Sequence, residues 1–133
     1  MRIAVAAGLL DEIAGHARDC LPEEACGFLI GRSGNADHFV PAPNALRSQT
    51  AFEVEPRFLF NLFRKLRSSG EDLLAIYHSH PTGDAVPSAR DVAEAHYPDC
   101  VYLIVSLTGV EPDIRAYRIV GREVLEMELH AIY

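Results

Sequence analysis

One apolar segment that runs directly into a histidine-rich motif constrains this chain more than any other feature. Residues Leu73–Tyr77 form a continuous hydrophobic run that predicts a buried strand. The run continues without a break into His78-Ser79-His80-Pro81. Because side chains two residues apart in a strand point to the same face, His78 and His80 can converge on one metal ion.

A carboxylate follows at a distance that suits the same ion. Ten residues separate His80 from Asp91, which is enough for a turn and the first turn of a helix. Histidine and aspartate are both zinc ligands, and three protein ligands leave the fourth tetrahedral position free for water, as in catalytic zinc sites. The spacing therefore predicts an open, hydrolytic zinc site.

Each part of this pattern also has a simpler interpretation. A lone His-x-His pair on a strand is usually a surface feature, and Ser88-x-x-Asp91 fits the capped start of a helix. His96 fits a polar position late in the same helix. The strand, the histidine pair, a turn with proline and glycine, and the capped helix occur together, and this favours the metal site. The cap is compatible with the site, since it holds the carboxylate in a fixed orientation.

Two further carboxylates precede a second apolar strand. Glu23 and Glu24 come immediately before Ala25-Cys26-Gly27-Phe28-Leu29-Ile30. A carboxylate near an activated water can take its proton and later deliver it to a leaving amine. The same two residues also fit the solvated end of a connection between a helix and a strand, and their spacing does not choose between them.

Three polar motifs of the chain together resemble the JAMM motif of MPN-plus (Mov34/PAD-1) zinc metallopeptidases. They are Glu24-x-x-Gly27, His78-x-His80-Pro81 and Ser88-x-x-Asp91. The resemblance extends over almost the whole chain and is strongest to the short bacterial and archaeal members. It implies that one Zn²⁺ per chain is bound by His78, His80 and Asp91. It further implies that Glu24 is the general base and that Ser88 steadies the oxyanion.

The resemblance also implies a class of substrate. Family members cleave the peptide or isopeptide bond after the Gly-Gly tail of ubiquitin-like proteins. Because the chain is a short domain with the compact bacterial form of the motif, the first expectation is processing of a ubiquitin-like sulfur carrier. Desampylase-type removal of ubiquitin-like modifiers is the second. Residues Asn44–Glu53 are a candidate wall of the groove for the tail.

Other functional classes fit less well. Residues 81–91 also resemble the RadC-like family, which is linked to DNA processing, but the acidic composition and the Glu24 segment favour the peptidases. Non-catalytic MPN scaffolds lack the metal ligands found here. Zinc nucleoside deaminases, whose fold is related, need a Pro-Cys-x-x-Cys pair, and only Cys100 follows Pro98.

Length and composition are typical of one compact enzyme domain. The 133 residues are 49% hydrophobic and 23% charged, so a single domain over residues 1–133 is expected. The net charge of −7 and the lack of a basic run disfavour nucleic acid as a partner. No apolar stretch reaches the length of a membrane span, and three cysteines without a Cys-x-x-Cys motif favour reduced thiols in the cytoplasm.

The element pattern predicts an α+β fold, a three-layer α/β/α sandwich around a mixed sheet, as in MPN/JAB1-type and cytidine-deaminase-like proteins. Apolar residues recur at helical spacing in some segments and alternate in others, and residues 1–10 are expected to belong to the fold. The predicted helices cover 10–21, 56–70 and 88–97. The predicted strands cover 26–32, 37–41, 52–54, 73–77, 100–107, 114–120 and 123–129.

Overall fold

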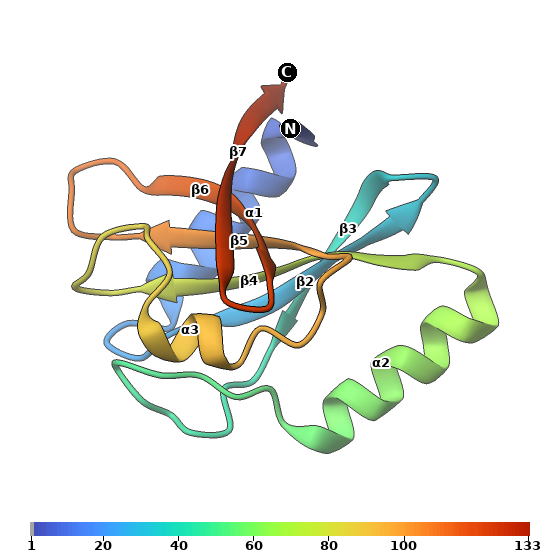
Figure 1. The fold of residues 1–133 in the computed structure, drawn as a ribbon, viewed down its shortest axis with the longest axis horizontal. Coiled ribbons are helices and arrows are strands. Elements are labelled where there is room, and N and C mark those ends of the chain that lie inside the picture. The colour runs from blue at the N-terminus through green and yellow to red at the C-terminus, as the bar shows by residue number, and fades with distance from the viewer. Residues whose placement is uncertain (1) are drawn as a thin grey trace.

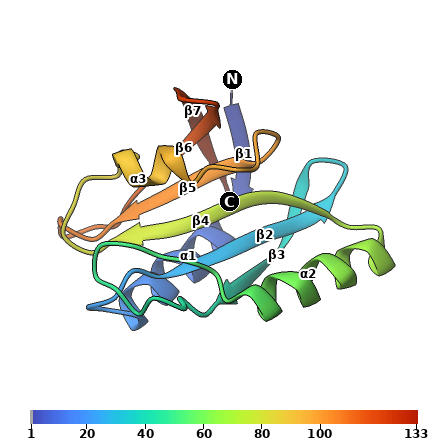
Figure 2. The same ribbon diagram turned by 60° about the horizontal axis from the view of Figure 1, so that its bottom comes forward.

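The computed structural model describes residues 2–133, and Met1 lies outside the described part. Within that range, seven strands form one mixed sheet in the order β1-β7-β6-β5-β4-β2-β3, with three helices packed against it (Figures 1 and 2). The strands are β1 (Arg2–Ala6), β2 (Cys26–Arg32), β3 (Asn35–Ala42), β4 (Asp72–His80), β5 (Val101–Ser106), β6 (Asp113–Val120) and β7 (Glu123–Ile132). The helices are α1 (Ala7–Asp19), α2 (Pro56–Ser69) and α3 (Ala89–Ala93). The predicted α+β fold with a mixed sheet between helices is confirmed.

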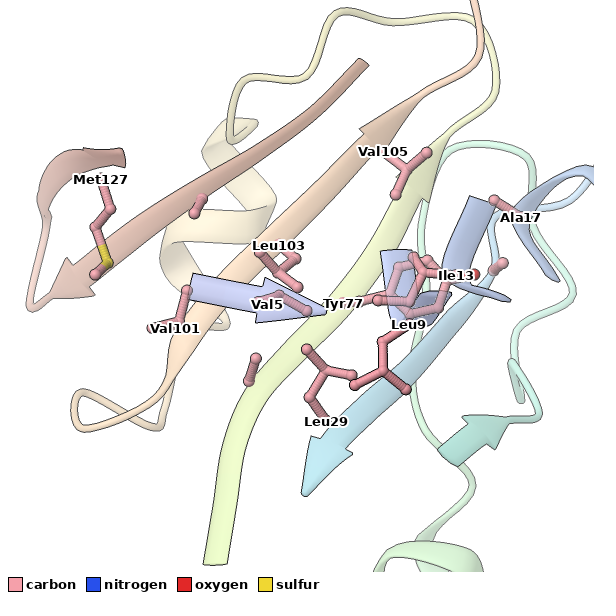
Figure 3. Packing of buried hydrophobic residues seen from close by; sticks show 13 residues of the cluster. Val5, Leu9, Ile13, Ala17, Leu29, Tyr77, Val101, Leu103, Val105 and Met127 are labelled. Atoms are coloured by element: carbon pink, nitrogen blue, oxygen red, sulfur yellow. The ribbon is translucent and has the colours of Figure 1, made fainter. Parts of the chain in front are cut away.

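The side chains of the central strands point alternately into two hydrophobic cores, one on each face of the sheet. On one face, Leu29 and Tyr77 belong to the core that α1 covers, and Figure 3 shows Leu9 and Ile13 of α1 beside them. On the other face, neighbouring strand residues such as Phe28 and Ile76 pack with Leu62 and Leu66 of α2. Since successive strand side chains point to opposite faces, the central strands supply both cores and are apolar along most of their length.

The boundaries of α2 follow from its end residues, as the sequence predicts. Pro56 occupies the first helical turn, where its missing N–H is not needed, and the Glu55 carboxylate accepts hydrogen bonds from the N–H groups of Arg57 and Phe58. Gly70 ends the helix in the left-handed conformation, at φ 75°. α1, α2 and α3 all fall short of the length and hydrophobicity that a transmembrane helix requires.

β4 is the strand that positions the site, and it lies in the interior of the sheet (Figure 1). It pairs with β2 in antiparallel and with β5 in parallel orientation. Its pairing with β5 continues through His80, so both histidines belong to the strand itself. This extends the predicted strand over residues 73–77 by three residues at its C-terminal end and gives both imidazoles a rigid backbone.

Three elements differ from the sequence-based expectation. Residues 2–6 form β1, which pairs with β7 at the far end of the chain, so no local sequence pattern predicts this strand. The predicted strand over 52–54 is reduced to a single bridge between Asn44 and Val54. The third helix ends at Ala93 instead of Tyr97, because the Tyr97 N–H donates to the Tyr102 hydroxyl and Pro98 disfavours a helical conformation before it.

Truncation of Leu103 tests the central position of β5. Leu103 is fully buried in the core under α1, so Leu103→Ala is expected to lower the free energy of unfolding by about 2–5 kcal/mol. Leu125 on β7 is 47% exposed, and Leu125→Ala serves as the matched control, with an expected change below about 0.5 kcal/mol. Urea denaturation of both variants measures the two values, and equal losses would contradict the described core.

Candidate metal centre

Three side chains from two elements meet at the C-terminal end of β4. His78 and His80 are on the strand, and Asp91 is in the first turn of α3. The two Nε2 atoms are 3.1 Å apart, and each is 3.1 Å from Oδ2 of Asp91. The structure therefore brings together the three residues that the sequence selects as metal ligands, and among the described residues they are the one group with ligand atoms gathered in this way.

This triangle of atoms fits a small cation. Ligands bound to zinc in tetrahedral geometry at about 2.0–2.2 Å lie about 3.3–3.6 Å from one another. The observed separations of 3.1 Å are close to this spacing. Two imidazole nitrogens and one carboxylate oxygen are ordinary zinc donors, and three of them leave one coordination position for water or substrate. The group can hold a metal ion, and its donor set suits zinc.

The two imidazole rings are oriented by different means. His80 Nδ1 lies 2.7 Å from the carbonyl oxygen of Asp84, which can only accept a hydrogen bond, so the neutral ring keeps its proton on Nδ1 and can offer the Nε2 lone pair to a metal ion. His78 is 2% exposed and stacks on the ring of Phe52, with centroids 4.6 Å apart. Its Nδ1 atom has no hydrogen-bond partner within residues 2–133. Hydrogen bonding thus fixes His80, whereas packing fixes His78.

The start of α3 fixes the carboxylate. The Ser88 hydroxyl accepts a hydrogen bond from the Asp91 N–H at 3.0 Å, and Asp91 Oδ2 accepts one from the Ser88 N–H at 2.9 Å. This reciprocal pair is a capping box, the simpler interpretation of these two residues. The cap and the ligand position coexist, since the same Oδ2 atom faces both imidazoles.

The charges of the triangle favour metal binding by an ionised carboxylate. Burial raises the pKa of Asp91, but hydrogen bonds from His78, His80 and the Ser88 N–H outweigh burial and hold that pKa well below its usual range. Burial lowers the pKa of His80, yet its hydrogen bonds to Asp91 and to the Asp84 carbonyl make the net shift upward. A metal ion must therefore displace a proton from the His80 imidazole, and its binding weakens at acidic pH.

The pairing of β2 with β4 places Glu24 next to this triangle. Cys26 is opposite His78 in the antiparallel register, so the same register continued by two residues puts Glu24 opposite His80. Two hydrogen bonds show that the pairing does continue: Ser79 N–H donates to the Ala25 carbonyl at 3.0 Å, and Ala25 N–H donates to the Ser79 hydroxyl at 2.8 Å. Opposite residues point to the same face of a sheet, so Glu24 and His80 face the same side.

Glu24 is a buried carboxylate that lacks a full set of partners. The residue is 5% exposed, and Oε1 has no hydrogen-bond partner within the described residues. Burial raises the pKa of Glu24 to about 7; His80 and Arg90 oppose the shift, and Asp91 adds to it. Glu23, by contrast, is only partly buried. Spacing alone leaves Glu23 and Glu24 undecided, and the family resemblance favours Glu24. In the structure Glu24 is the one beside the ligand atoms, and it can exchange a proton near neutral pH.

Three residues that support the site are not among the site residues predicted from the sequence. Asp84 acts through its backbone carbonyl, so its residue type gives no signal. Phe52 supplies the ring under His78 from a loop that is distant in sequence. The side-chain amide of Asn44 donates to the Glu24 carbonyl at 3.1 Å and thereby anchors the loop next to Glu24. Asn44 and Phe52 belong to the segment Asn44–Glu53 that the sequence predicts as a wall of the groove, but the sequence does not indicate the contacts of these two residues with the site.

Metal titration tests the triangle without reference to activity. Addition of Zn²⁺ to chelator-treated protein is expected to raise the melting temperature, because a ligand at 100 times its Kd stabilises the native state by about 2.7 kcal/mol. His80→Ala removes one of the three donors and should abolish most of this rise. His38→Ala, which changes a 64% exposed histidine on β3, is the matched control. Equal zinc affinities for the two variants in calorimetric titration would refute the assignment.

The burial of Glu24 predicts that the metal-free protein loses stability as the pH rises. Its folded pKa of about 7 lies above the unfolded value of 4.5, so between these values the native state keeps a proton that the unfolded state has lost. Stability therefore falls as pH rises through this window. Chelator-treated Glu24→Gln should be more stable than wild type at pH 8.5, by up to about 3 kcal/mol, and equally stable near pH 4.

Denaturant unfolding of both proteins across this pH range measures the difference. Glu23→Gln is the control, and we expect its stability to follow that of wild type. A constant difference between Glu24→Gln and wild type at every pH would contradict the described burial of a titrating carboxylate.

Comparison with known proteins identifies the family of this chain. Residues 6–120 match the family model described as prokaryotic homologs of the JAB domain. The CysO-cysteine peptidase of Mycobacterium tuberculosis is 33% identical over 133 residues, which cover 98% of this chain and 91% of that protein. The desampylase of Haloferax volcanii is 38% identical over 117 residues, covering 81% of this chain and 83% of that protein.

A solved structure agrees as well. The solution structure of protein DSY2949 from Desulfitobacterium hafniense superposes with a TM-score of 0.87 at 32% identity, and the match covers 98% of this chain and 92% of that one. The family match includes all five residues that the sequence selects for the site. This chain therefore belongs to the prokaryotic JAB family, the group to which its sequence motifs are similar.

Proposed function

We propose that this protein is a zinc-dependent metallopeptidase that hydrolyses the bond after the C-terminal Gly-Gly of a ubiquitin-like protein. The observation that carries the proposal is the position of Glu24, a buried carboxylate with an unpaired oxygen, beside a triangle of three ligand atoms. A base next to an open metal site is the arrangement that hydrolysis of an amide requires. The names of the relatives, a peptidase and a desampylase, support the same reaction class.

His78, His80 and Asp91 would hold the ion, one per chain. When bound, zinc supplies a Lewis acid that polarises a carbonyl and lowers the pKa of a coordinated water to about 7. Glu24 would take a proton from the attacking water through its unpaired Oε1 and deliver it to the nitrogen of the leaving amine. Its raised pKa suits both steps, since a base that must also act as an acid works best near the ambient pH.

Ser88 has a hydroxyl proton available for the reaction. Its oxygen accepts the Asp91 N–H, so the cap uses a lone pair and leaves the hydroxyl proton free to be donated. The cap also restricts the position of the oxygen next to the Asp91 ligand. Donation to the developing oxyanion is the role we propose for Ser88, and the loss of one such donor typically costs about 3 kcal/mol of transition-state stabilisation.

An apolar groove beside His78 suits an extended peptide. The cavity has a volume of about 420 Å³, and aromatic and aliphatic side chains dominate its lining, with Phe52, Leu59, Tyr97 and Tyr102 among them. Phe52 belongs both to this groove and to the metal centre, where it stacks on His78. A tail in this groove would therefore lie next to His78, on the other side of the Phe52 ring.

Two groups of substrates remain within this proposal. The first is a ubiquitin-like sulfur carrier that carries residues beyond Gly-Gly, in line with the CysO-cysteine peptidase relative. The second is a protein conjugate joined through an isopeptide bond, in line with the desampylase. A RadC-like or non-catalytic role is the alternative that the experiment below distinguishes.

We also propose that residues 1–133 act as a single catalytic domain in the cytoplasm. Support for one domain comes from the shared sheet, whose central strands contribute to both cores. Support for a reducing compartment comes from Cys20, Cys26 and Cys100, which are all free thiols.

The decisive experiment is cleavage followed by intact mass. A ubiquitin-like sulfur carrier extended past Gly-Gly is incubated with wild type, Glu24→Gln, Glu23→Gln and chelator-treated protein, and zinc content is measured in each sample. We expect cleavage directly after Gly-Gly, a loss of about 10²- to 10⁴-fold in Glu24→Gln with zinc retained, and little change in Glu23→Gln. Zinc binding without cleavage of any Gly-Gly substrate would reject this substrate class, and absence of zinc would favour a scaffold.

A further inference from the structure

Helix α2 is positively charged although the protein as a whole is acidic. It carries four of the 12 lysines and arginines of the chain and no aspartate or glutamate, whereas the net charge is −7. The four cations are exposed, and no carboxylate within residues 2–133 forms an ion pair with any of them. They are Arg57, Arg64, Lys65 and Arg67. α2 is therefore a local basic surface whose charges have no partner in the described chain.

Three of these cations share one side of the helix with an exposed aromatic ring. Arg57, Phe60, Arg64 and Arg67 follow one another at intervals of three or four residues, so they form a single row, here called the basic stripe. Phe60 is 63% exposed. A single exposed apolar side chain is ordinary. An aromatic ring among arginines, however, is the composition that is enriched at protein interfaces.

The basic stripe adjoins the apolar groove at Phe52. That groove extends from Phe52, which stacks on His78, to Pro56 and Leu59 in the first turns of α2, and Leu59 immediately precedes Phe60. The opposite side of the helix is buried in the core. Figures 1 and 2 show α2 at the margin of the molecule, with no other helix or strand on its outer side. A protein whose tail occupies the groove would therefore have its folded body next to α2.

The composition of the basic stripe specifies the partner. Guanidinium groups bind carboxylates through two parallel hydrogen bonds, and an exposed phenyl ring is best covered by apolar atoms. The stripe thus fits carboxylates arranged around a small apolar area. The acidic remainder of the chain does not prevent this contact, because charges beyond about 8 Å are largely screened at physiological ionic strength. A nucleic-acid-binding domain is typically basic overall, whereas this chain has an isoelectric point near 5.3, which favours a protein partner.

We propose that the basic stripe of α2 is the docking surface for the folded body of the ubiquitin-like substrate, and that this body is acidic next to its tail. The inference rests on the proposed function and adds a second contact region to the groove. The Gly-Gly tail alone cannot distinguish one ubiquitin-like protein from another. Charges on the body can, because complementary charges steer association and like charges reject the wrong partner. The stripe therefore selects the substrate, whereas the metal centre cleaves it.

Charge reversal with two matched substrates tests the assignment. One substrate is a ubiquitin-like carrier that is acidic next to its tail and extended past Gly-Gly, and the other is a peptide of the same extended tail without the body. Arg64→Glu/Arg67→Glu is expected to lower kcat/KM for the carrier about 10-fold or more, through KM, because it reverses the charges that steer association. Cleavage of the peptide should stay as in wild type, since the groove and the metal centre are unchanged.

Controls separate the position of the charges from their number. Arg18→Glu/Arg122→Glu changes the net charge equally at exposed sites on α1 and in the turn between β6 and β7, and its kcat/KM for the carrier should stay as in wild type. Conversion of the carrier carboxylates next to the tail to amides should reproduce the loss with wild-type enzyme. An equal loss for carrier and peptide in Arg64→Glu/Arg67→Glu, or no loss for either, would overturn the docking role while the peptidase activity stands.

A binding measurement keeps the docking role apart from the proposed function. If neither substrate is cleaved, the proposed function fails, and calorimetric titration with the carrier ending in Gly-Gly still tests the basic stripe. A Kd that rises about 10-fold in Arg64→Glu/Arg67→Glu, and also in Phe60→Ala, would support docking without peptidase activity. No binding by wild type, or equal affinities in all variants, would overturn it. Tighter binding of single-stranded DNA than of the carrier, lost on charge reversal, would likewise overturn it in favour of nucleic acid.

Discussion

The antiparallel pairing of β2 with β4 is the constraint on which the rest of this molecule depends. Its register sets Cys26 opposite His78, and its continuation through Ala25 and Ser79 sets Glu24 opposite His80. A shift of this register by one residue would turn every side chain of one strand to the other face. Glu24 would then point toward the core under α1, and the site would lose its base. The two apolar cores hold the register, because each needs its own set of alternate residues from both strands.

The same pairing explains how a carboxylate comes to be buried with an unpaired oxygen. Asn44 and Ser48 hold the backbone of Glu24, so this segment cannot move away from the ligands without breaking those hydrogen bonds. Burial then disfavours the charged form and raises the pKa of Glu24 to about 7. This is a local loss of stability that the rest of the fold outweighs, and it is a pattern typical of catalytic groups.

Much of the fold follows from local patterns, and the exceptions have physical causes. The bounds of α2 can be predicted from the sequence because Pro56 and Gly70 act through their own backbone preferences. β2 can be predicted because a short apolar run flanked by polar residues is typical of a buried strand. β1 is not, because its partner β7 is at the opposite end of the chain, and pairing across that distance is decided by the packing of the whole sheet. The early end of α3 likewise depends on a hydroxyl, that of Tyr102, which comes from the next strand.

For the site, the sequence by itself determined which chemical groups are present and which of them share a strand or a helix turn. Alternation along β4 puts His78 and His80 on one face, and the capping pattern puts Asp91 in a first helical turn; both are consequences of backbone geometry over a few residues. Only the tertiary structure decided that Glu24 is buried beside these ligands while Glu23 stays partly exposed, and that Phe52 and the Asp84 carbonyl orient the imidazoles. The reason is that these relations join segments brought together by strand pairing and loop hydrogen bonds, whose partners are distant in sequence and carry no local signal.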